Sequence, residues 1–127
     1  MTMRIQGLVK TFNSGAAIAR SRIVQFGADE RTVIQSSAAT SSHIGVADDV
    51  ATPGAGEPVE VVMAGVATVE YGAAVTRGAL LTSDASGRAI VAAAAAGANV
   101  RTVGVAMVDG VLGDLGAVRL HPGSFQG

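Results

Sequence analysis

The sequence predicts an all-β fold, a small β-barrel or β-sandwich built from two similar halves. A duplication is the first observation: Gly15–Ile34 (GAAIARSRIVQFGADERTVI) recurs without a gap, 57 positions later, as Gly72–Val91 (GAAVTRGALLTSDASGRAIV). Turn signals separate short β-branched segments along the chain, and no long window keeps a 3.6-residue apolar stripe. We expect the 127 residues to form a single domain, because neither half, at roughly 50 residues, would easily bury its strands alone.

Residues 1–13 precede the first copy and have no counterpart between the copies. Two interpretations stay open for them: an ordinary first strand or frayed terminus, and an extended N-terminal arm that packs on a neighbouring molecule. We designate this segment the N-terminal arm. Our hypothesis is that Ile5, Leu8 and Phe12 anchor it on a partner or an adjacent protomer.

The repeat continues beyond the ungapped stretch. In both halves a loop of small residues leads to a hydrophobic-Gly-Val-Ala strand, Ile44–Ala47 in the first and Val103–Ala106 in the second. The spacing has grown to 59 there, and loops tolerate such length changes. We assign the first repeat to residues 14–65 and the second to residues 71–123, which leaves residues 124–127 as a tail.

The connections also follow the repeat. Each half has a glycine-acid turn, Gly56-Glu57 or Gly113-Asp114, before its last strand. Asp84–Gly87 has the composition of a tight turn between two strands, and Met63–Val66 is a further candidate turn. The five alanines before Gly97 are too few for a stable helix, so one helical turn or an irregular loop is expected there.

Composition excludes several classes of function. Nine basic residues balance ten acidic ones, to a formal charge of -1, without a basic run, and aromatic residues make up only 3%. Nucleic-acid binders use basic patches and stacking rings, so we expect no nucleic-acid partner. The chain has no cysteine, and it shows neither a membrane-length apolar segment nor a signal-peptide pattern, so we expect a soluble, unprocessed protein.

The candidate chemical groups favour structural roles. His43 and His121 are the only histidines and are not equivalent in the repeats, and no spacing typical of metal ligands accompanies them. Ser41, Ser42, His43 and Asp48 have the residue types of a hydrolase triad, but neighbours on an extended segment point to opposite sides. We therefore predict no catalytic residue, no metal site and no cofactor.

Two further residue patterns bear on function. Asp48-Asp49 and Glu57 flank a glycine-rich loop and could in principle act as acid and base, but a solvated turn explains them better. Biotinyl and lipoyl carrier domains are also small duplicated β proteins, yet they need a lysine at a hairpin tip. Lys10, the sole lysine, lies before the repeats.

The segment Gly78–Ala89 (GALLTSDASGRA), preceded by Val59–Gly65 and followed by Val103–Ala106, resembles the tailed-phage capsid cement, or head decoration, proteins. Ala16–Arg20 through Ile44–Ala47 is similar to the N-terminal half of that family. The resemblance spans about Lys10 to Gly123. It implies a β-tulip-like structural protein, made in the bacterial cytoplasm, that binds the outside of an assembled head and stabilises it.

The resemblance also implies self-association as a homotrimer and a major capsid protein as the partner, and it contributes no catalytic residues. Two alternatives stay open. One is a small-ligand-binding or enzymatic β-barrel with a cleft between the repeats. The other is a different virion component, such as a tail or baseplate protein.

Overall fold

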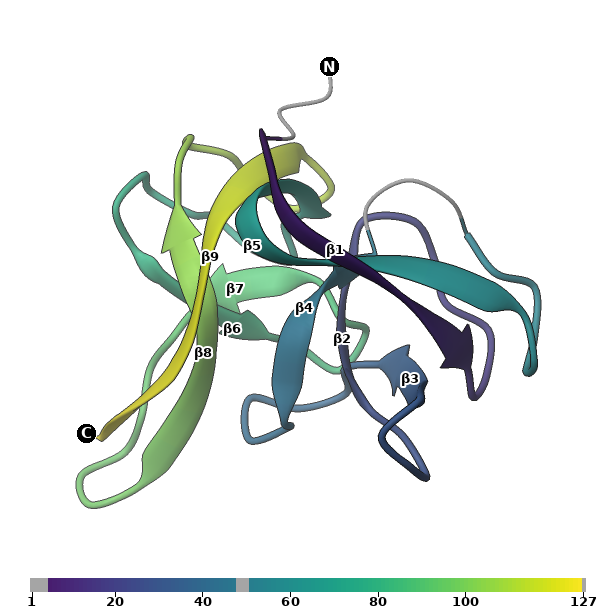
Figure 1. Cartoon of the computed structure of the whole chain (residues 1–127). Coiled ribbons are helices and arrows are strands. Elements are labelled where there is room, and N and C mark those ends of the chain that lie inside the picture. Colours follow the sequence, from purple (N-terminus) through teal and green to yellow (C-terminus); the bar gives the residue numbers. More distant parts are fainter. Residues whose placement is uncertain (1–4, 48–50, 127) are drawn as a thin grey trace.

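The computed structural model describes residues 5–47 and 51–126. This part of the chain contains β-strands and no helix, which confirms the predicted all-β class (Figure 1). The strands are β1 (Ile5–Ser14), β2 (Arg22–Phe26), β3 (Thr32–Gln35), β4 (His43–Ala47), β5 (Pro58–Glu70), β6 (Leu80–Ser83), β7 (Ala89–Val91), β8 (Asn99–Ala106) and β9 (Leu115–Gln126).

Five strands close into a barrel in the first half of the chain. Their order is β1-β3-β2-β4-β5, and β1 pairs with β3 on one side and with β5 on the other, which closes the circuit. The β1–β3 pairing is parallel and short, joining Asn13 to Thr32 and Ser14 to Val33. The β1–β5 pairing is antiparallel and runs from Ile5 opposite Val66 to the far end of β1.

The second half repeats this arrangement with the strands β5-β9-β8-β6-β7. A parallel bridge between Tyr71, just after β5, and Ala89 in β7 returns the circuit to its start. Equivalent pairs occur in both halves: Thr11 lies opposite Glu60, and Thr68, 57 positions after Thr11, lies opposite Ala117. The fold is therefore built from two similar halves, as predicted.

Strand β5 belongs to both halves. Its first part pairs with β1, and its last part, Gly65–Glu70, pairs with β9. The prediction of a turn at Met63–Val66 is wrong, because β5 continues through these residues without interruption. Gly65 has a positive φ of 92°, which a residue without a Cβ adopts readily, and the strand curves strongly in this region (Figure 1). The glycine thus bends one strand instead of separating two.

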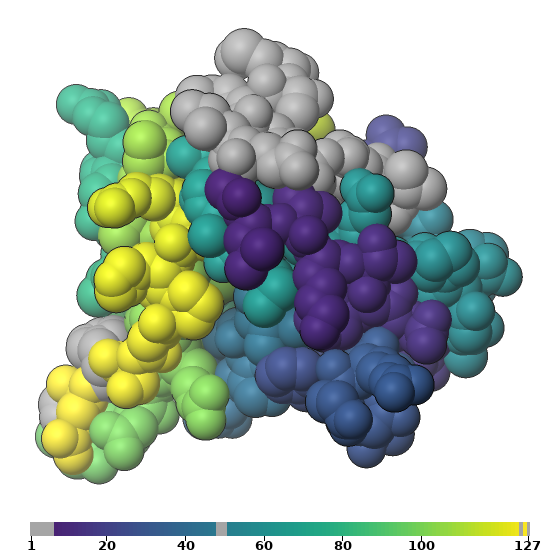
Figure 2. Space-filling model, in the orientation of Figure 1, coloured from purple at the N-terminus to yellow at the C-terminus, as the bar shows by residue number. Residues whose placement is uncertain are grey.

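The segment designated as an arm is the first strand of the sheet from residue 5 onward, one of the two interpretations considered for it. Residues 1–4 lie outside the described part. Residues 124–126 of the expected tail belong to β9. The paired ends of β8 and β9 project from the body at the lower left of Figures 1 and 2.

The loops agree with their composition. The alanine run forms no helix but an irregular connection that closes in a turn, in which the Ala98 N–H bonds to the Ala95 carbonyl at 2.9 Å. The Asp84–Gly87 turn forms as predicted. One Asp84 oxygen accepts bonds from the backbone N–H groups of Ser86 and Arg88, at 2.8 and 3.0 Å.

The core of the described residues consists of two clusters of mainly aliphatic side chains. The first cluster fills the first barrel with the buried residues Phe12, Ile18, Val24, Val33, Ala47, Val59 and Val61. The second cluster contains Ile23, Val46 and Val62 from the first half and Tyr71, Leu81, Val103 and Val118, among others, from the second. Residues of both halves therefore share one core cluster.

Candidate functional site

The three residues of the interface hypothesis are placed differently. Leu8 is 54% exposed, whereas Phe12 is 4% exposed. The backbone of Ile5 pairs with Val66, and the side chain of Ile5 lies outside the described part. Of the two side chains that the structure describes in this set, Leu8 is thus the exposed one.

Phe12 stabilises the protein's own barrel. Its ring meets that of Phe26 edge to face, with centroids 6.3 Å apart. The β1–β5 register shifts on both sides of Leu8, and a bulge reverses the alternation of side chains along a strand. The pairing from Val9 to Phe12 is regular, so alternation on β1 alone does not separate the exposed Leu8 from the buried Phe12.

His43 lies buried at the seam between the halves, with 5% of its surface exposed. Its Nδ1 lies 2.9 Å from the Ser36 hydroxyl and its Nε2 lies 3.5 Å from the Thr82 hydroxyl. Because Thr82 donates its proton to the Arg101 carbonyl at 2.7 Å, Nε2 acts as the donor and Nδ1 as the acceptor, which is a neutral imidazole. Burial, and secondarily the Arg101 charge, lowers the pKa of His43 to about 4.

The triad residues are not assembled into a site. The His43 ring bonds to Ser36 and Thr82, not to Ser41 or Ser42, and Asp48 lies outside the described part. The Asp48-Asp49 pair lies outside it as well. Glu57 stands in the glycine-acid turn, where its backbone N–H bonds to the Ser14 hydroxyl at 3.1 Å.

The other candidate groups are dispersed over the described residues. No group of three or more His, Asp or Glu side chains in residues 5–47 and 51–126 could hold a metal ion. His121 is exposed in β9, and Lys10 lies within β1, opposite Val61. Within the same ranges, no helix is long and apolar enough to cross a membrane.

An exposed apolar turn joins β8 to β9. Val111, Leu112 and Leu115 are 58%, 62% and 55% exposed, and we call Val111–Leu115 the apolar turn. The sequence prediction did not include this turn, although the sequence carries a signal for it. When the two copies are aligned on their glycine-acid turns, the first copy has Gly54-Ala55 where the second copy has Val111-Leu112.

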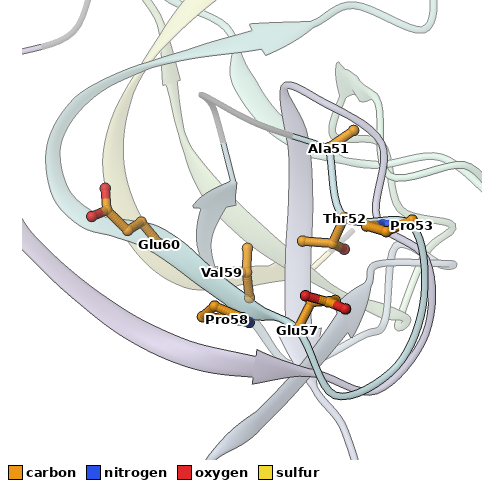
Figure 3. A pocket seen from close by; sticks show the side chains of 7 residues that line it. All are labelled: Ala51, Thr52, Pro53, Glu57, Pro58, Val59 and Glu60. Carbon is orange, nitrogen blue, oxygen red and sulfur yellow. The ribbon is translucent and has the colours of Figure 1, made fainter.

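A hollow of about 430 Å³ lies beside the corresponding turn of the first half (Figure 3). The start of β5 forms one side of it and the loop that carries Thr52 forms the other. Its lining consists of Ala51, Thr52, Pro53, Glu57, Pro58, Val59 and Glu60. Glu60 points away from the other six side chains (Figure 3). Four of those six are apolar, and Thr52 and Glu57 are the polar residues among them.

Comparison with known families decides what kind of protein this is. The family model described as phage cement protein matches residues 3–120, nearly the whole chain. The chain belongs to the phage cement protein family. It is therefore a structural protein of a phage.

The fold of this cement protein also has a solved relative. The N base of the head fiber protein gp8.5 of bacteriophage phi29 has a TM-score of 0.67 with it, at 14% sequence identity, and the match covers 90% of this chain and 93% of that one. At this identity the likeness establishes the fold. A search of curated protein sequences found no match.

Family membership makes an enzyme an unlikely assignment for this cement protein and directs attention to its surface. In the described residues, three surface features stand out: Leu8 on β1, the apolar turn, and the hollow. They lie on different strands or loops of the chain.

Proposed function

We propose that this protein decorates the outer surface of an assembled phage head and stabilises the shell, as a homotrimer bound to the major capsid protein. The observation that carries the proposal is the match of the cement protein family to residues 3–120. The structural relative, a head fiber base, is named for the phage head as well. Made in the bacterial cytoplasm, the protein would act on the exterior of the virion.

The barrel suits this role on physical grounds. A capsid staple needs a rigid body with apolar surface that is buried at subunit contacts. Leu8 supplies such surface on β1, with 54% of its area exposed. We retain Ile5 and Leu8 as proposed contacts of the N-terminal segment and assign Phe12 to the core of this chain.

The decisive experiment mixes the purified protein with undecorated heads and images them by electron microscopy. The proposal predicts added density on the head exterior at local threefold positions. Binding to tails or baseplates instead would support the other virion assignment. Absence of binding to any head would overturn the decoration function.

A point substitution tests the contact on β1. Deleting residues 2–12 would remove most of the strand that closes the first barrel, so Leu8→Lys is the better variant. We expect Leu8→Lys to lower head occupancy while the far-ultraviolet circular dichroism spectrum stays unchanged. The matched control is Leu80→Lys, at a leucine that is 44% exposed on β6. Equal occupancy for both variants would contradict a contact at Leu8.

A further inference from the structure

The two glycine-acid turns have the same backbone structure. In the first half, the Ser14 N–H bonds to the Glu57 carbonyl at 2.8 Å and the Gly56 N–H bonds to the Ser14 carbonyl at 2.7 Å. In the second half, Tyr71 forms the same two bonds with Asp114 and Gly113, at 2.8 and 2.9 Å. Gly56 and Gly113 have φ values of 84° and 88°. Both turns are thus bonded in the same way to equivalent positions, the end of β1 and the residue that follows β5.

The side chains on the two turns differ. Gly54, Ala55 and Pro58 in the first half correspond to Val111, Leu112 and Leu115 in the second. Since Gly54 and Ala55 support the same turn, its conformation does not require large aliphatic side chains. Yet the side chains of Val111, Leu112 and Leu115 are more than half exposed. Clustered exposed apolar side chains on a soluble protein typically mark a contact surface.

The apolar turn is held rigidly for such a contact. The Asp114 carboxylate accepts a bond from the Val111 N–H at 2.9 Å, and the Asp114 N–H bonds to the Val111 carbonyl at 3.0 Å. A surface that is already ordered loses little conformational entropy on binding. Leu112, at 62% exposure, therefore projects as a preorganised apolar knob.

The hollow is complementary to this knob in chemistry and in size. Ala51, Pro53, Pro58 and Val59 give it apolar walls. An apolar cavity of about 150 Å³ already holds a benzene-sized group, so the 430 Å³ of the hollow can receive Leu112 together with a neighbouring side chain. The hollow flanks the start of β5 and the knob precedes β9, and these two strand ends lie in different parts of Figure 1.

We propose that the apolar turn of one chain inserts into the hollow of a second copy of the same chain. Knob and hollow are different surfaces, so the contact is heterologous, and a ring of three would use each surface once per chain. The inference rests on the self-association in the proposed function and needs no head. It assigns the trimer contact to the second-half turn and the first-half loop, neither of which includes Leu8.

Two variants remove one surface each. Val111→Ser with Leu112→Ser removes the knob and leaves the hollow, while Ala51→Trp fills the hollow and leaves the knob. The control is the double variant Leu80→Ser with Val91→Ser. These two residues are 44% and 42% exposed and belong neither to the apolar turn nor to the lining of the hollow. Mass is measured by light scattering after size-exclusion chromatography, and folding by circular dichroism and thermal melting.

We expect trimers for the wild type and the control and folded monomers for the two variants. A mixture of the two variants should form 1:1 dimers and nothing larger, because only one knob and one hollow remain usable. A monomeric wild type, trimers in either variant, or the absence of mixed dimers would overturn the inference. A knob variant that stays trimeric but loses head binding would instead make the turn a capsid contact. A trimer that binds no head would overturn the decoration function alone.

Discussion

His43 shows how one buried side chain connects the two halves of the molecule. Its ring lies on β4 of the first half and contacts Ser36 from the same half and Thr82 from the second. Thr82 in turn bonds to the backbone of Arg101 in β8. The ring is neutral in this network, and its protonation would place a charge in a buried seam near the Arg101 cation.

The protein should lose stability through His43 as the pH falls. In the unfolded chain His43 has its ordinary pKa of 6.5, so it takes up a proton as the pH falls below that value. In the folded chain the pKa is about 4, so the ring takes up the proton only near pH 4. The unfolded state thus binds more protons between these values, so the contribution is complete above pH 6.5 and declines as the pH falls through this window. We expect a loss of about 2 kcal/mol between pH 7 and pH 5.

Urea unfolding of the wild type and of His43→Gln at pH 7, 6 and 5 measures this effect. The variant lacks the titrating ring, so its free energy of unfolding should change less over the same range. Equal pH dependence in the two proteins would assign the loss to other groups.

Gly45 and Gly104 occupy equivalent positions in the two halves. Because they have no Cβ, the neighbouring strand can approach closely at each position. A Cβ on Gly45 would meet the carbonyl oxygen of Val62, and a Cβ on Gly104 would meet that of Arg119. Both contacts are to backbone atoms of the next strand, which cannot rotate away. This is the physical reason for the glycine in the hydrophobic-Gly-Val-Ala segment of each half.

We expect Gly45→Ala and Gly104→Ala each to lower the free energy of unfolding by about 1–3 kcal/mol, the usual cost of overpacking. The matched control is Gly54→Ala, at a glycine with open space around its Cβ position and no positive φ. Denaturant unfolding at constant pH gives the comparison. If the three variants were equally stable, the strand contact would not explain the pattern.

At the level of the strands, the two halves fill one equivalent space with different residues. In the second half, the Tyr71 ring lies against Gly110 and Gly116, where any Cβ would collide with it. In the first half, Ser14 and Val59 stand 57 positions before Tyr71 and Gly116, and Thr52 forms the bridge to Ile18 that Gly110 forms to Val75; all three residues are buried. One large ring beside two glycines has thus been exchanged for three smaller side chains. Both solutions fill the space, as close packing requires.

This exchange predicts an energetic coupling. Gly116→Val should destabilise the protein by about 3 kcal/mol, because its side chain overlaps the Tyr71 ring, and Tyr71→Ser should cost a similar amount through the cavity that it leaves. In the double variant the valine occupies part of that cavity. We therefore expect the double variant to be more stable than the sum of the single effects by at least ~1 kcal/mol.

A double-mutant cycle from urea unfolding measures this coupling. Gly123→Val is the control on the same strand, since a Cβ there lies 3.5 Å from Thr102 Oγ1, an ordinary contact distance. It should show no coupling to Tyr71→Ser. Additive effects of Gly116→Val and Tyr71→Ser would contradict the packing explanation.

At the level of the whole molecule, ion pairs and a backbone hydrogen bond join the two halves. Glu70 at the end of β5 pairs with Arg22 of β2 at 3.3 Å and with Arg88 at 3.8 Å. The Ile23 N–H bonds to the Gly87 carbonyl at 2.8 Å, and a Cβ on Gly87 would collide with the Gln35 side chain. The Asp84–Gly87 turn therefore packs on the first barrel. Its counterpart near Asp29 has an exposed position.

We expect the two halves to unfold together because they share β5, a core cluster and this seam. Val24→Ala, in the first-half core, should cost about 2 kcal/mol and lower the midpoint recorded by Tyr71 fluorescence in the second half. Tyr71 is the only tyrosine, and the chain has no tryptophan. Amide exchange in β2 should shift by the same free energy. If the unfolding midpoint recorded by Tyr71 fluorescence were the same in Val24→Ala as in the wild type, the two halves would unfold independently. Val91→Ala, at an exposed position, is the control.

Much of the fold could be predicted from local patterns. Period-two alternation, turn residues and the 57-residue duplication predicted an all-β protein with two similar halves. The site was less accessible. Leu8 and Phe12 look equivalent by alternation, yet in the structure the leucine is exposed and the ring is buried. The lining of the hollow lies within residues 51–60, but residue types alone do not show that the loop and the start of β5 leave a hollow between them.

The sequence by itself determined the strand content, the duplication and the resemblance to the cement proteins, because each of these depends on residue type and spacing along the chain. Only the tertiary structure decided that β5 serves both halves, that Phe12 is core, and that the apolar turn and the hollow are separate surfaces. The reason is physical: strand partners and registers depend on pairing between distant segments, and a one-residue shift exchanges the buried and exposed faces.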